Sequence, residues 1–376
     1  MGELPSLAVF PNDPLAAYLS KGEVKPRYFN PADLFDEVHI FTPADSEASV
    51  EQVQAMFGTA RVTIHHLGHL DLLNYRSKAS LAAEKLAAAK CDVVRAYNPL
   101  LQGYVAARAA RASKLPFVLS VHSNYDHDSR AMALREGHLA SYLKLLYTKW
   151  FVEPDVIRSA DVVICAYRFV EEYVRRRRRD GITTIYNRVY LDEYRVPRES
   201  HEGFVVMTVG RLDKARNHST LVRAAIISRA DLLIVGDGPE REALEALSRG
   251  AEGRVRLMKS VPHSEMARLY RSADVFALAM KYGGISIPVL EAMAAGLPLV
   301  LAKENLDGDK ELVEGASLLV DNDVESFAEA FDRLRDPDLR ASLSRVSLGR
   351  APTFDASLVE GREAEVYRSL LQSEAH

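Results

Sequence analysis

Short runs of hydrophobic residues, rich in β-branched side chains, alternate along the chain with longer segments of helical periodicity. The short runs predict buried strands, and the longer segments predict amphipathic helices. Strands separated by helices in this way are typical of parallel sheets. The alternation stops in a polar stretch, residues 189–203, which contains Pro197 and Gly203, and then resumes. We therefore predict two α/β domains joined by a linker.

The pattern also gives approximate bounds for the elements of the first half. The predicted strands are residues 7–10, 37–41, 61–66, 92–96, 117–122, 161–166 and 183–186. The predicted helices are residues 46–57, 76–90, 100–113, 130–151 and 168–179.

The second half repeats the alternation. The predicted strands are residues 204–209, 231–235, 254–258, 274–279, 297–301 and 317–320. The predicted helices are residues 218–229, 240–248, 264–272, 286–295, 324–335, 338–344 and 355–371. The predicted parts are an N-terminal domain (1–188), a linker (189–203), a C-terminal domain (204–353) and a helix crossing back to the first domain (354–376).

Ligands of open parallel sheets bind at the carboxyl ends of the strands. We therefore expect two Rossmann-like domains that face each other across a cleft. Composition supports ordinary globular domains, because 48% of the 376 residues are hydrophobic. The net charge of −4 argues against a nucleic-acid binder, which usually carries a basic excess.

The two cysteines and the N-terminal residues indicate the cellular compartment in which the protein is expected. The two cysteines, Cys91 and Cys165, both lie in hydrophobic strand-like runs, which favours buried thiols in a reducing compartment. The first residues lack a basic region followed by a long hydrophobic stretch, and no hydrophobic run is long enough to span a bilayer. A cytoplasmic location is therefore expected.

The segment after the strand 204–209 is the first candidate site. Gly210, Arg211 and Arg216 form a turn that leads into the helix 218–229. Backbone N–H groups at a helix N-terminus and guanidinium groups both favour phosphate. The alternative is a surface turn with solvated basic side chains.

The second candidate site is the Gly-Gly turn at Gly283 and Gly284, which opens a hydrophobic helix. Glu291 is the one carboxylate in that helix, and a buried carboxylate requires partners. Ribose hydroxyls are suitable partners. The alternative is a glutamate that pairs with a nearby arginine or caps the helix.

Several motifs of the second half occur together in a specific order. They are Val-Gly-Arg at 209–211 with Arg-Asn at 216–217, Val-Gly-Asp-Gly-Pro-Glu-Arg at 235–241, Tyr-Arg-Ser-Ala-Asp-Val-Phe-Ala-Leu at 270–278, and Gly-Gly-Ile-Ser-Ile-Pro-Val-Leu-Glu-Ala-Met-Ala-Ala-Gly-Leu-Pro at 283–298. Over residues 203–332 the chain resembles the retaining nucleotide-sugar glycosyltransferases of family 4, which have the GT-B fold. The first half is similar more weakly, through Val-His-Ser-Asn-Tyr-Asp at 121–126 and Tyr-Asn-Arg-Val at 186–189.

The resemblance implies a role for each matching residue. His122 would contact the transferred sugar near the anomeric carbon, and Arg211 and Arg216 would hold the donor diphosphate and act in catalysis. The other implied donor-binding residues are Gly210, Met258, Val261, Gly284, Ile285, Ser286 and Glu291. UDP is the expected donor nucleotide because it is the commonest among similar enzymes. The nucleotide sugar is a substrate, so no cofactor is expected. Two arginines and a helix N-terminus can stabilise the charge on the leaving phosphate, so no metal is expected.

The chain departs from the family pattern at two positions of the second half. Gly283 stands where the family has the first glutamate of a pair, and Arg216 stands where it usually has lysine. The family's N-terminal Gly-Gly loop is also not evident, and residues 20–23 or 27–30 are candidates for its place. A donor-binding protein without catalysis is therefore one alternative. A nucleotide-sugar epimerase or phosphorylase of the same architecture is another.

The acceptor side is less specific. Asp126 and Arg130 follow His122 and are candidate acceptor contacts, or alternatively caps of the next helix. The expected acceptor is a hydroxyl of a glycan, a lipid-linked sugar or a small molecule. The helix 130–151, with aromatic, leucine and lysine side chains, fits peripheral contact with the inner face of a membrane or packing in a core.

Two further clusters of basic side chains do not indicate a site. Adjacent His65 and His66 point to opposite faces of a strand, which argues against a metal site with His69. The arginine run 175–179 is interpreted as a solvated helix end.

Overall fold

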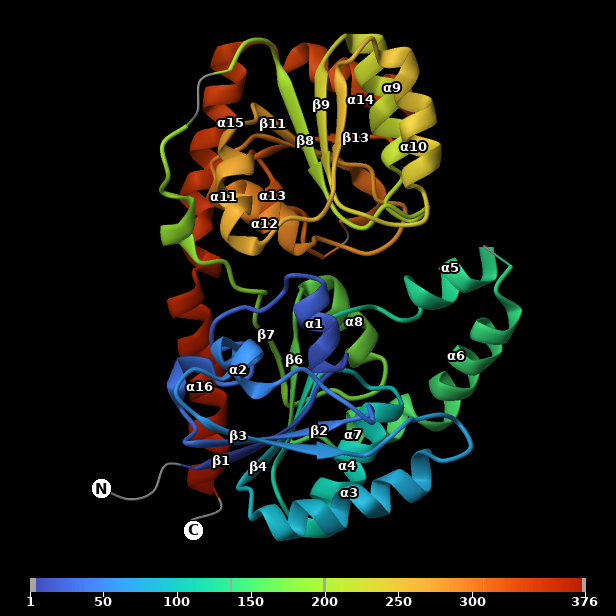
Figure 1. Cartoon of the computed structure of the whole chain (residues 1–376), viewed down its shortest axis with the longest axis vertical. Helices are drawn as coiled ribbons and strands as arrows, with labels where there is room; N and C mark the ends of the chain where they lie inside the picture. The colour runs from blue at the N-terminus through green and yellow to red at the C-terminus, as the bar shows by residue number, and fades with distance from the viewer. Residues whose placement is uncertain (1–4, 136, 199–200, 307, 374–376) are drawn as a thin grey trace. The chain divides into compact units, whose positions relative to one another are not determined.

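The computed structural model describes residues 5–135, 137–198, 201–306 and 308–373. The predicted linker, the helix 130–151 and both chain ends each include positions outside these ranges. The first compact unit runs to Tyr186 and includes the chain from Val359 onward, and the second is Asn187–Leu358. Each unit has its own sheet (Figure 1).

The first unit contains a seven-stranded parallel sheet in the order β3-β2-β1-β4-β5-β6-β7. Its strands are β1 (Ser6–Phe10), β2 (Glu37–Thr42), β3 (Arg61–His66), β4 (Val93–Ala96), β5 (Phe117–Val121), β6 (Val162–Cys165) and β7 (Ile182–Thr184). The central strands are buried on both faces, which explains their continuous hydrophobic runs.

Helices connect these strands. They are α1 (Leu15–Ser20), η1 (Pro31–Asp33), α2 (Val50–Val53), η2 (Gln54–Phe57), α3 (Tyr75–Ala89), α4 (Leu101–Ser113), α5 (Ser129–Arg135), α6 (Leu139–Phe151), α7 (Glu153–Ser159) and α8 (Arg168–Arg175). The single helix predicted over 130–151 is wrong, because Gly137 adopts φ +74° and separates α5 from α6.

The C-terminal helix α16 (Ala356–Ser373) belongs to the first unit from Val359 onward. Its Tyr367 is fully buried and lies edge-on to Phe35, with 5.1 Å between ring centroids. Glu360 accepts a hydrogen bond from Nε of Arg27 at 2.7 Å. Residues far apart in the sequence thus build one hydrophobic core.

The second unit contains a six-stranded parallel sheet in the order β10-β9-β8-β11-β12-β13. Its strands are β8 (Val205–Val209), β9 (Asp231–Val235), β10 (Val255–Met258), β11 (Val275–Leu278), β12 (Leu299–Ala302) and β13 (Ser317–Val320). Its helices are η3 (Leu191–Tyr194), α9 (His218–Ser228), α10 (Arg241–Ser248), η4 (Arg249–Ala251), α11 (His263–Arg271), α12 (Ile287–Ala294), η5 (Lys303–Asn305), α13 (Lys310–Val313), α14 (Val324–Arg333), α15 (Pro337–Arg350) and η6 (Ala351–Phe354).

The strand order creates a topological switch point in this sheet. The chain builds outward from β8 to β9 and β10 and then returns to place β11 on the other side of β8. The connections that follow β8 and β11 therefore diverge, which leaves space for a ligand at their carboxyl ends. These two connections contain most of the predicted donor residues.

The segment predicted as a linker, residues 189–203, groups with the second unit. Tyr194 is buried, and Nη2 of Arg198 lies 2.5 Å from Oδ1 of Asp274. In the described part of the chain, no helix combines the length and the hydropathy needed to cross a bilayer.

Candidate functional site

The loop after β8 packs backbone to backbone against the loop after β9. The N–H of Gly210 donates to the carbonyl of Val235 at 3.0 Å, and the N–H of Leu212 donates to the carbonyl of Asp237 at 2.9 Å. A Cβ atom at Gly236 would lie 1.9 Å from the carbonyl oxygen of Gly210. Glycine is therefore required at 236 by this close approach.

The loop after β11 is tied to the loop after β8. The N–H of Lys281 donates to the carbonyl of Ala215 at 2.8 Å. Asn322 strengthens this connection: its Nδ2 donates to the carbonyl of Ala279 at 3.0 Å, and its Oδ1 accepts from Asn217 at 3.0 Å. The two predicted halves of the donor site are thus neighbours at the switch point.

The two predicted phosphate-binding arginines both lie on the loop after β8. The Arg211 side chain is 71% exposed, and its Nε is 3.7 Å from Oδ2 of Asp213. The partly buried Arg216 lies alongside Gly210, since a Cβ there would be 3.5 Å from the Arg216 Nε. The arrangement places positive charge beside the N-terminus of α9, which favours an anion.

His218 is the first residue of α9, and no sequence motif assigns it a role. It is 2% exposed, and neither ring nitrogen has a hydrogen-bond partner in the part of the chain that the structure describes. Burial, aided by the charge of Arg216, lowers the pKa of His218 to about 4. The imidazole is therefore neutral at pH 7.

The predicted segment 284–286 leads directly into α12. Ser286 is the N-cap residue, Ile285 is buried, and Gly283 before them adopts φ +85°. The Ser286 hydroxyl does not cap the helix, and within the described ranges its Oγ is buried without a partner. The first N–H groups of α12 lack intrahelical acceptors, so this turn presents donors to a ligand.

The predicted ribose ligand Glu291 lies inside α12 and is 6% exposed. The hydroxyl of Tyr270, on α11, donates to Oε2 of Glu291 at 2.9 Å, and Nδ1 of His263 is 3.9 Å from Oε1. Burial, together with the Glu291 charge, raises the pKa of Tyr270 well above its usual value. Tyr270 is therefore a permanent hydrogen-bond donor to this carboxylate. The ribose contact itself stays a prediction.

The predicted base-binding residues follow β10. The carbonyl of Met258 accepts hydrogen bonds from the N–H of Gly236 and from Nη2 of Arg241, both at 3.1 Å. Val261 lies in the loop between β10 and α11. The loop after β9 thus connects Met258 to the loop after β8.

His122 lies in the first unit, directly after β5. Its ring is nearly parallel to that of Tyr97, with 6.0 Å between centroids. Burial and the nearby Arg95 lower the pKa of His122 to about 4. Its Nε2 is buried and lacks a partner among the described residues, so the neutral ring is suited to a hydrogen bond with a ligand.

The candidate acceptor residues Asp126 and Arg130 belong to a charged network. Arg130 is buried, pairs with Asp126 at 3.1 Å and bonds to the fully buried Glu153. Asp126 also pairs with Lys149 at 2.8 Å and Arg177 at 3.3 Å. Although burial opposes it, the Lys149 hydrogen bond and these cations lower the pKa of Asp126. The contacts account for both residues without a ligand, and the acceptor role stays a prediction.

The same network corrects the interpretation of the arginine run 175–179. The side chain of Arg177 is only 9% exposed and that of Arg178 only 13%, and the latter donates to the carbonyl of Ile157 at 3.2 Å. The run is therefore not simply a solvated helix end, because these two side chains fix the end of α8 against α7.

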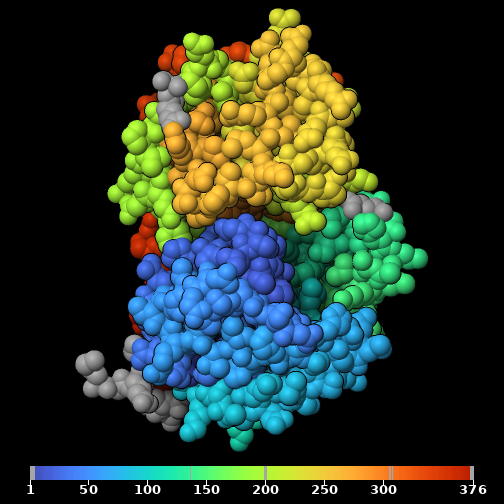
Figure 2. Space-filling model, viewed as in Figure 1, coloured from blue at the N-terminus to red at the C-terminus, as the bar shows by residue number. Residues whose placement is uncertain are grey.

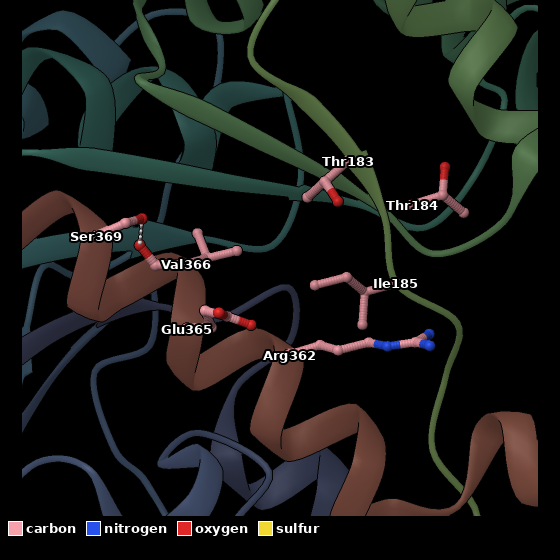
Figure 3. Close-up of a pocket in the computed structure, with 7 residues that line it drawn as sticks. All are labelled: Thr183, Thr184, Ile185, Arg362, Glu365, Val366 and Ser369. Atoms are coloured by element: carbon pink, nitrogen blue, oxygen red, sulfur yellow. Dashed lines mark hydrogen bonds between the residues drawn. The ribbon is translucent and has the colours of Figure 1, made fainter.

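Two other features of the first unit lie apart from the predicted site residues. Nδ1 of His39 is 3.0 Å from Nε2 of His65, but the described residues contain no group of three or more side chains arranged to hold a metal ion. A groove of about 350 Å³ lies between β7 and α16 and is lined by Thr184, Arg362 and Glu365, among others (Figure 3). None of the predicted site residues lines it.

Both halves of the chain match known family profiles. The profile described as Glycosyltransferase Family 4 matches residues 32–193, and the profile described as Glycosyl transferases group 1 matches residues 203–336. Together these matches cover well over half of the chain.

The chain is also similar to proteins that are named as glycosyl-transferring enzymes. Alpha-monoglucosyldiacylglycerol synthase of Acholeplasma laidlawii is 22% identical over 335 residues, which is 82% of this chain and 83% of that protein. A D-inositol 3-phosphate glycosyltransferase of Acidothermus cellulolyticus is 35% identical over 191 residues, which is 45% of this chain and 42% of that protein.

Solved structures share the fold of two Rossmann-like domains. Anabaena Alr3699/HepE in complex with UDP has a TM-score of 0.73 at 18% identity, covering 97% of this chain and 100% of that one. Sucrose-phosphate synthase of Thermosynechococcus elongatus has a TM-score of 0.71 at 22% identity, covering 98% and 100%. These structures show the fold, and the two family profiles, which together match most of the chain, show that it belongs to the family 4 glycosyltransferases, with a group 1 glycosyltransferase domain in its second half.

Proposed function

We propose that this glycosyltransferase moves a sugar from a nucleoside-diphosphate sugar, preferably a UDP sugar, to a hydroxyl acceptor with retention of anomeric configuration. The observation that carries the proposal is the junction at the switch point, where the loop with Arg211 and Arg216 is tied to the loop that opens α12. The preference for UDP is supported by structural relatives that were solved with UDP or UDP-glucose.

The proposed donor contacts follow the elements of the second unit. Arg211 and Arg216 bind the diphosphate, helped by the backbone N–H groups at the start of α12. Glu291 accepts hydrogen bonds from the ribose hydroxyls, with its carboxylate oriented by Tyr270. The remaining proposed contacts are Gly210 on the diphosphate side, Met258 and Val261 beside the base, and Gly284, Ile285 and Ser286 beside the phosphates and sugar.

The proposed chemistry is cleavage of the bond between the anomeric carbon and the β-phosphate oxygen. The electron pair stays on the phosphate, so negative charge grows there in the transition state. Two guanidinium groups and a helix N-terminus, which are preorganised around the phosphate, stabilise that charge. The proposed mechanism therefore requires no metal ion. The acceptor hydroxyl attacks on the face from which the phosphate leaves, which retains configuration, and the departing phosphate oxygen takes its proton.

His122 is proposed to contact the sugar as a neutral hydrogen-bonding group. Its lowered pKa of about 4 supports this, because a protonated imidazole would repel a developing oxocarbenium ion. The proposed acceptors are glycans, lipid-linked sugars and small molecules. One relative is named for synthesis of a glucosyldiacylglycerol, and another for transfer to a sugar on diphospho-undecaprenol.

One observation favours a second candidate, a protein that binds the donor without turnover. Gly283 replaces the first glutamate of the family pair and adopts φ +85°, a conformation that a glutamate rarely takes. The sugar contact of that glutamate is therefore missing.

A donor panel separates these functions. The chain is incubated with UDP, GDP and ADP sugars together with glycan, lipid-linked and small-molecule hydroxyl acceptors, with and without EDTA, and nucleotide release and product anomers are followed by NMR. We expect release from a UDP sugar that EDTA does not reduce, with a product of retained configuration. Binding without release would support the second candidate, and an isomerised sugar nucleotide would refute both.

A further inference from the structure

A charged side chain lies inside the core of the first unit. Arg95 is 2% exposed and stands within the hydrophobic strand β4. Taking a guanidinium out of water is costly, and hydrophobic replacement of a buried ion pair is often neutral or stabilising. Stability alone therefore does not explain an arginine at this position.

A second strand and the C-terminal helix hold the Arg95 guanidinium. Its Nε and Nη2 donate to Oγ of Ser120 on β5 at 3.2 Å and 3.0 Å. Its Nη1 donates to the hydroxyl of Tyr367 at 2.9 Å, and its Nη2 also donates to Oε1 of Glu363 at 3.1 Å. Tyr367 and Glu363 both belong to α16, which runs along the first unit (Figure 1). The orientation of the guanidinium thus depends on residues 272 and 268 positions further along the chain.

One side of helix α16 is packed into the core of the first unit. Its Val359 and Tyr367 belong to the hydrophobic core of this unit. In the view of Figure 2, the blue N-terminal residues cover most of the red helix. The side chain of Glu363 is 12% exposed and that of Arg95 only 3%. This ion pair is therefore largely shielded from water, and its charges act strongly on neighbouring groups.

The same face of the sheet leads from Arg95 to His122. Side chains two positions apart along a strand share a face, so Tyr97 continues the face of Arg95 and His122 continues that of Ser120. The guanidinium carbon of Arg95 lies 4.5 Å from the centre of the Tyr97 ring. The Tyr97 ring is parallel to the His122 ring to within 12°, with 6.0 Å between centroids. Tyr97 therefore connects the buried guanidinium to the imidazole.

The two members of the ion pair act on His122 with opposite signs. Within the described ranges, the charged groups that act on this ring are Arg95 on β4 and Glu363 on α16. Burial is the main reason why the pKa of His122 is lowered; Arg95 lowers it further, and Glu363 opposes this effect. Removal of either charge should therefore change the protonation of His122, and the two changes should have opposite directions.

We propose that Arg95 and Glu363 are positioning residues for His122, with the Tyr97 ring as the contact through which the pair orients the imidazole. The inference rests on the proposed contact of His122 with the transferred sugar. Arg95 keeps the imidazole neutral and holds Tyr97 parallel to it, so that the buried Nε2 is available to the sugar. Helix α16 thereby completes the sugar-contacting side of the first unit.

Opposite shifts of one titration curve test the proposal. The His122 ring is titrated by NMR in the full chain, with His122→Asn to identify its signal. We expect Arg95→Gln to raise the pKa of His122 from about 4 towards the usual 6.5, and Glu363→Gln to lower it. Shifts in the same direction, or no shift in Glu363→Gln, would overturn the proposal.

Glu360→Gln is the matched control for Glu363→Gln. Glu360 lies on the same helix, is 3% exposed and pairs with Arg27 at 2.7 Å. The variant therefore loses a buried carboxylate that does not act on His122, and the pKa of His122 should stay as in the wild type. An equal shift in both glutamate variants would indicate disturbed packing of α16 and would also overturn the proposal.

Two substitutions of Tyr97 test the ring contact. The Tyr97 hydroxyl donates to the carbonyl of Tyr28 at 3.3 Å, so Tyr97→Phe loses this bond and keeps the ring. We expect Tyr97→Leu to lower kcat roughly tenfold to a hundredfold at unchanged donor KM, because His122 loses its orientation, and Tyr97→Phe to retain most of the activity. Equal kcat for Tyr97→Leu and the wild type would contradict the ring contact.

The titration needs no catalysis, so it separates this inference from the proposed function. Opposite shifts in a chain that transfers no sugar would support the positioning of His122 and count against the proposed function alone. Sugar transfer without the opposite shifts would support the proposed function and overturn this inference.

Discussion

The hydroxyl of Tyr270 donates a hydrogen bond to Oε2 of Glu291 at 2.9 Å, and both side chains are buried in the second unit. The bond joins α11 to α12 and fixes the one carboxylate that the family resemblance assigns to the ribose. It gives Tyr270 a positioning role that the sequence motif alone does not reveal.

Tyr270→Phe removes this donor and leaves the buried carboxylate with one partner fewer. We expect the free energy of unfolding to fall by about 1–3 kcal/mol and the affinity for UDP to weaken. Urea unfolding and calorimetric titration with UDP measure the two effects. Lower stability together with unchanged UDP affinity would separate Glu291 from the nucleotide, and Glu291→Gln should then also leave the affinity unchanged.

Arg211→Ala tests the proposed stabilisation of the leaving group. We expect a loss of about 2–4 kcal/mol of transition-state stabilisation, seen as a lower kcat, because a charged donor aimed at a developing anion is removed. Stability should be unaffected, since the side chain is 71% exposed. Arg195→Ala is the matched control, because Arg195 lies in the same unit and is 77% exposed. Equal kcat for the two variants would refute the role of Arg211.

Gly283→Glu restores the residue type that the family carries at this position. Because Gly283 adopts φ +85°, we expect the variant to lose about 1–2 kcal/mol of stability and to gain no activity. Gly349→Ala in α15 is the control. A Cβ atom at this position meets nothing within 4 Å, so this substitution should not lower the free energy of unfolding. Faster sugar transfer by Gly283→Glu at unchanged stability would show that the loop readily accepts a negative φ.

His218 makes stability depend on pH. Its folded-state pKa of about 4 lies below the usual 6.5, so between these values the unfolded chain binds more protons than the folded chain. The pKa difference corresponds to about 3 kcal/mol of the free energy of unfolding. This part of the stability is fully present above pH 6.5 and is lost as the pH falls towards 4. His218→Gln should reduce the slope of unfolding free energy against pH in this window. His69→Gln, at a side chain that is 81% exposed, should keep the wild-type slope. Identical slopes for all three proteins would contradict the assignment.

Hydrophobic alternation is enough to predict the two parallel sheets, because strands buried on both faces must be continuously hydrophobic. The bounds of β3 and β9 agree with their predicted ranges. The pattern does not predict the break between α5 and α6, since a glycine inside an amphipathic segment is compatible with a continuous helix until its φ is known. The pattern does not predict helix α7 either, because Glu153 and Asp155 in its first turn mask its short hydrophobic face.

Sequence motifs locate the donor loops, but they do not reveal the contacts of single charged or polar groups. The burial of Arg177 depends on Asp126 and Glu153, which lie 51 and 24 positions away. Likewise, the burial of His218 and the bond from Asn217 to Asn322 depend on how α9 meets the sheet. Such interactions are set by tertiary packing, and no local pattern encodes them.

A crystal structure of the chain with bound UDP tests the central claim most directly. The account predicts diphosphate oxygens at about 3 Å, hydrogen-bond distance, from the guanidinium groups of Arg211 and Arg216, at the carboxyl ends of β8 and β11. UDP bound elsewhere, for example in the groove lined by Thr184 and Arg362, with both arginines turned to solvent, would contradict it.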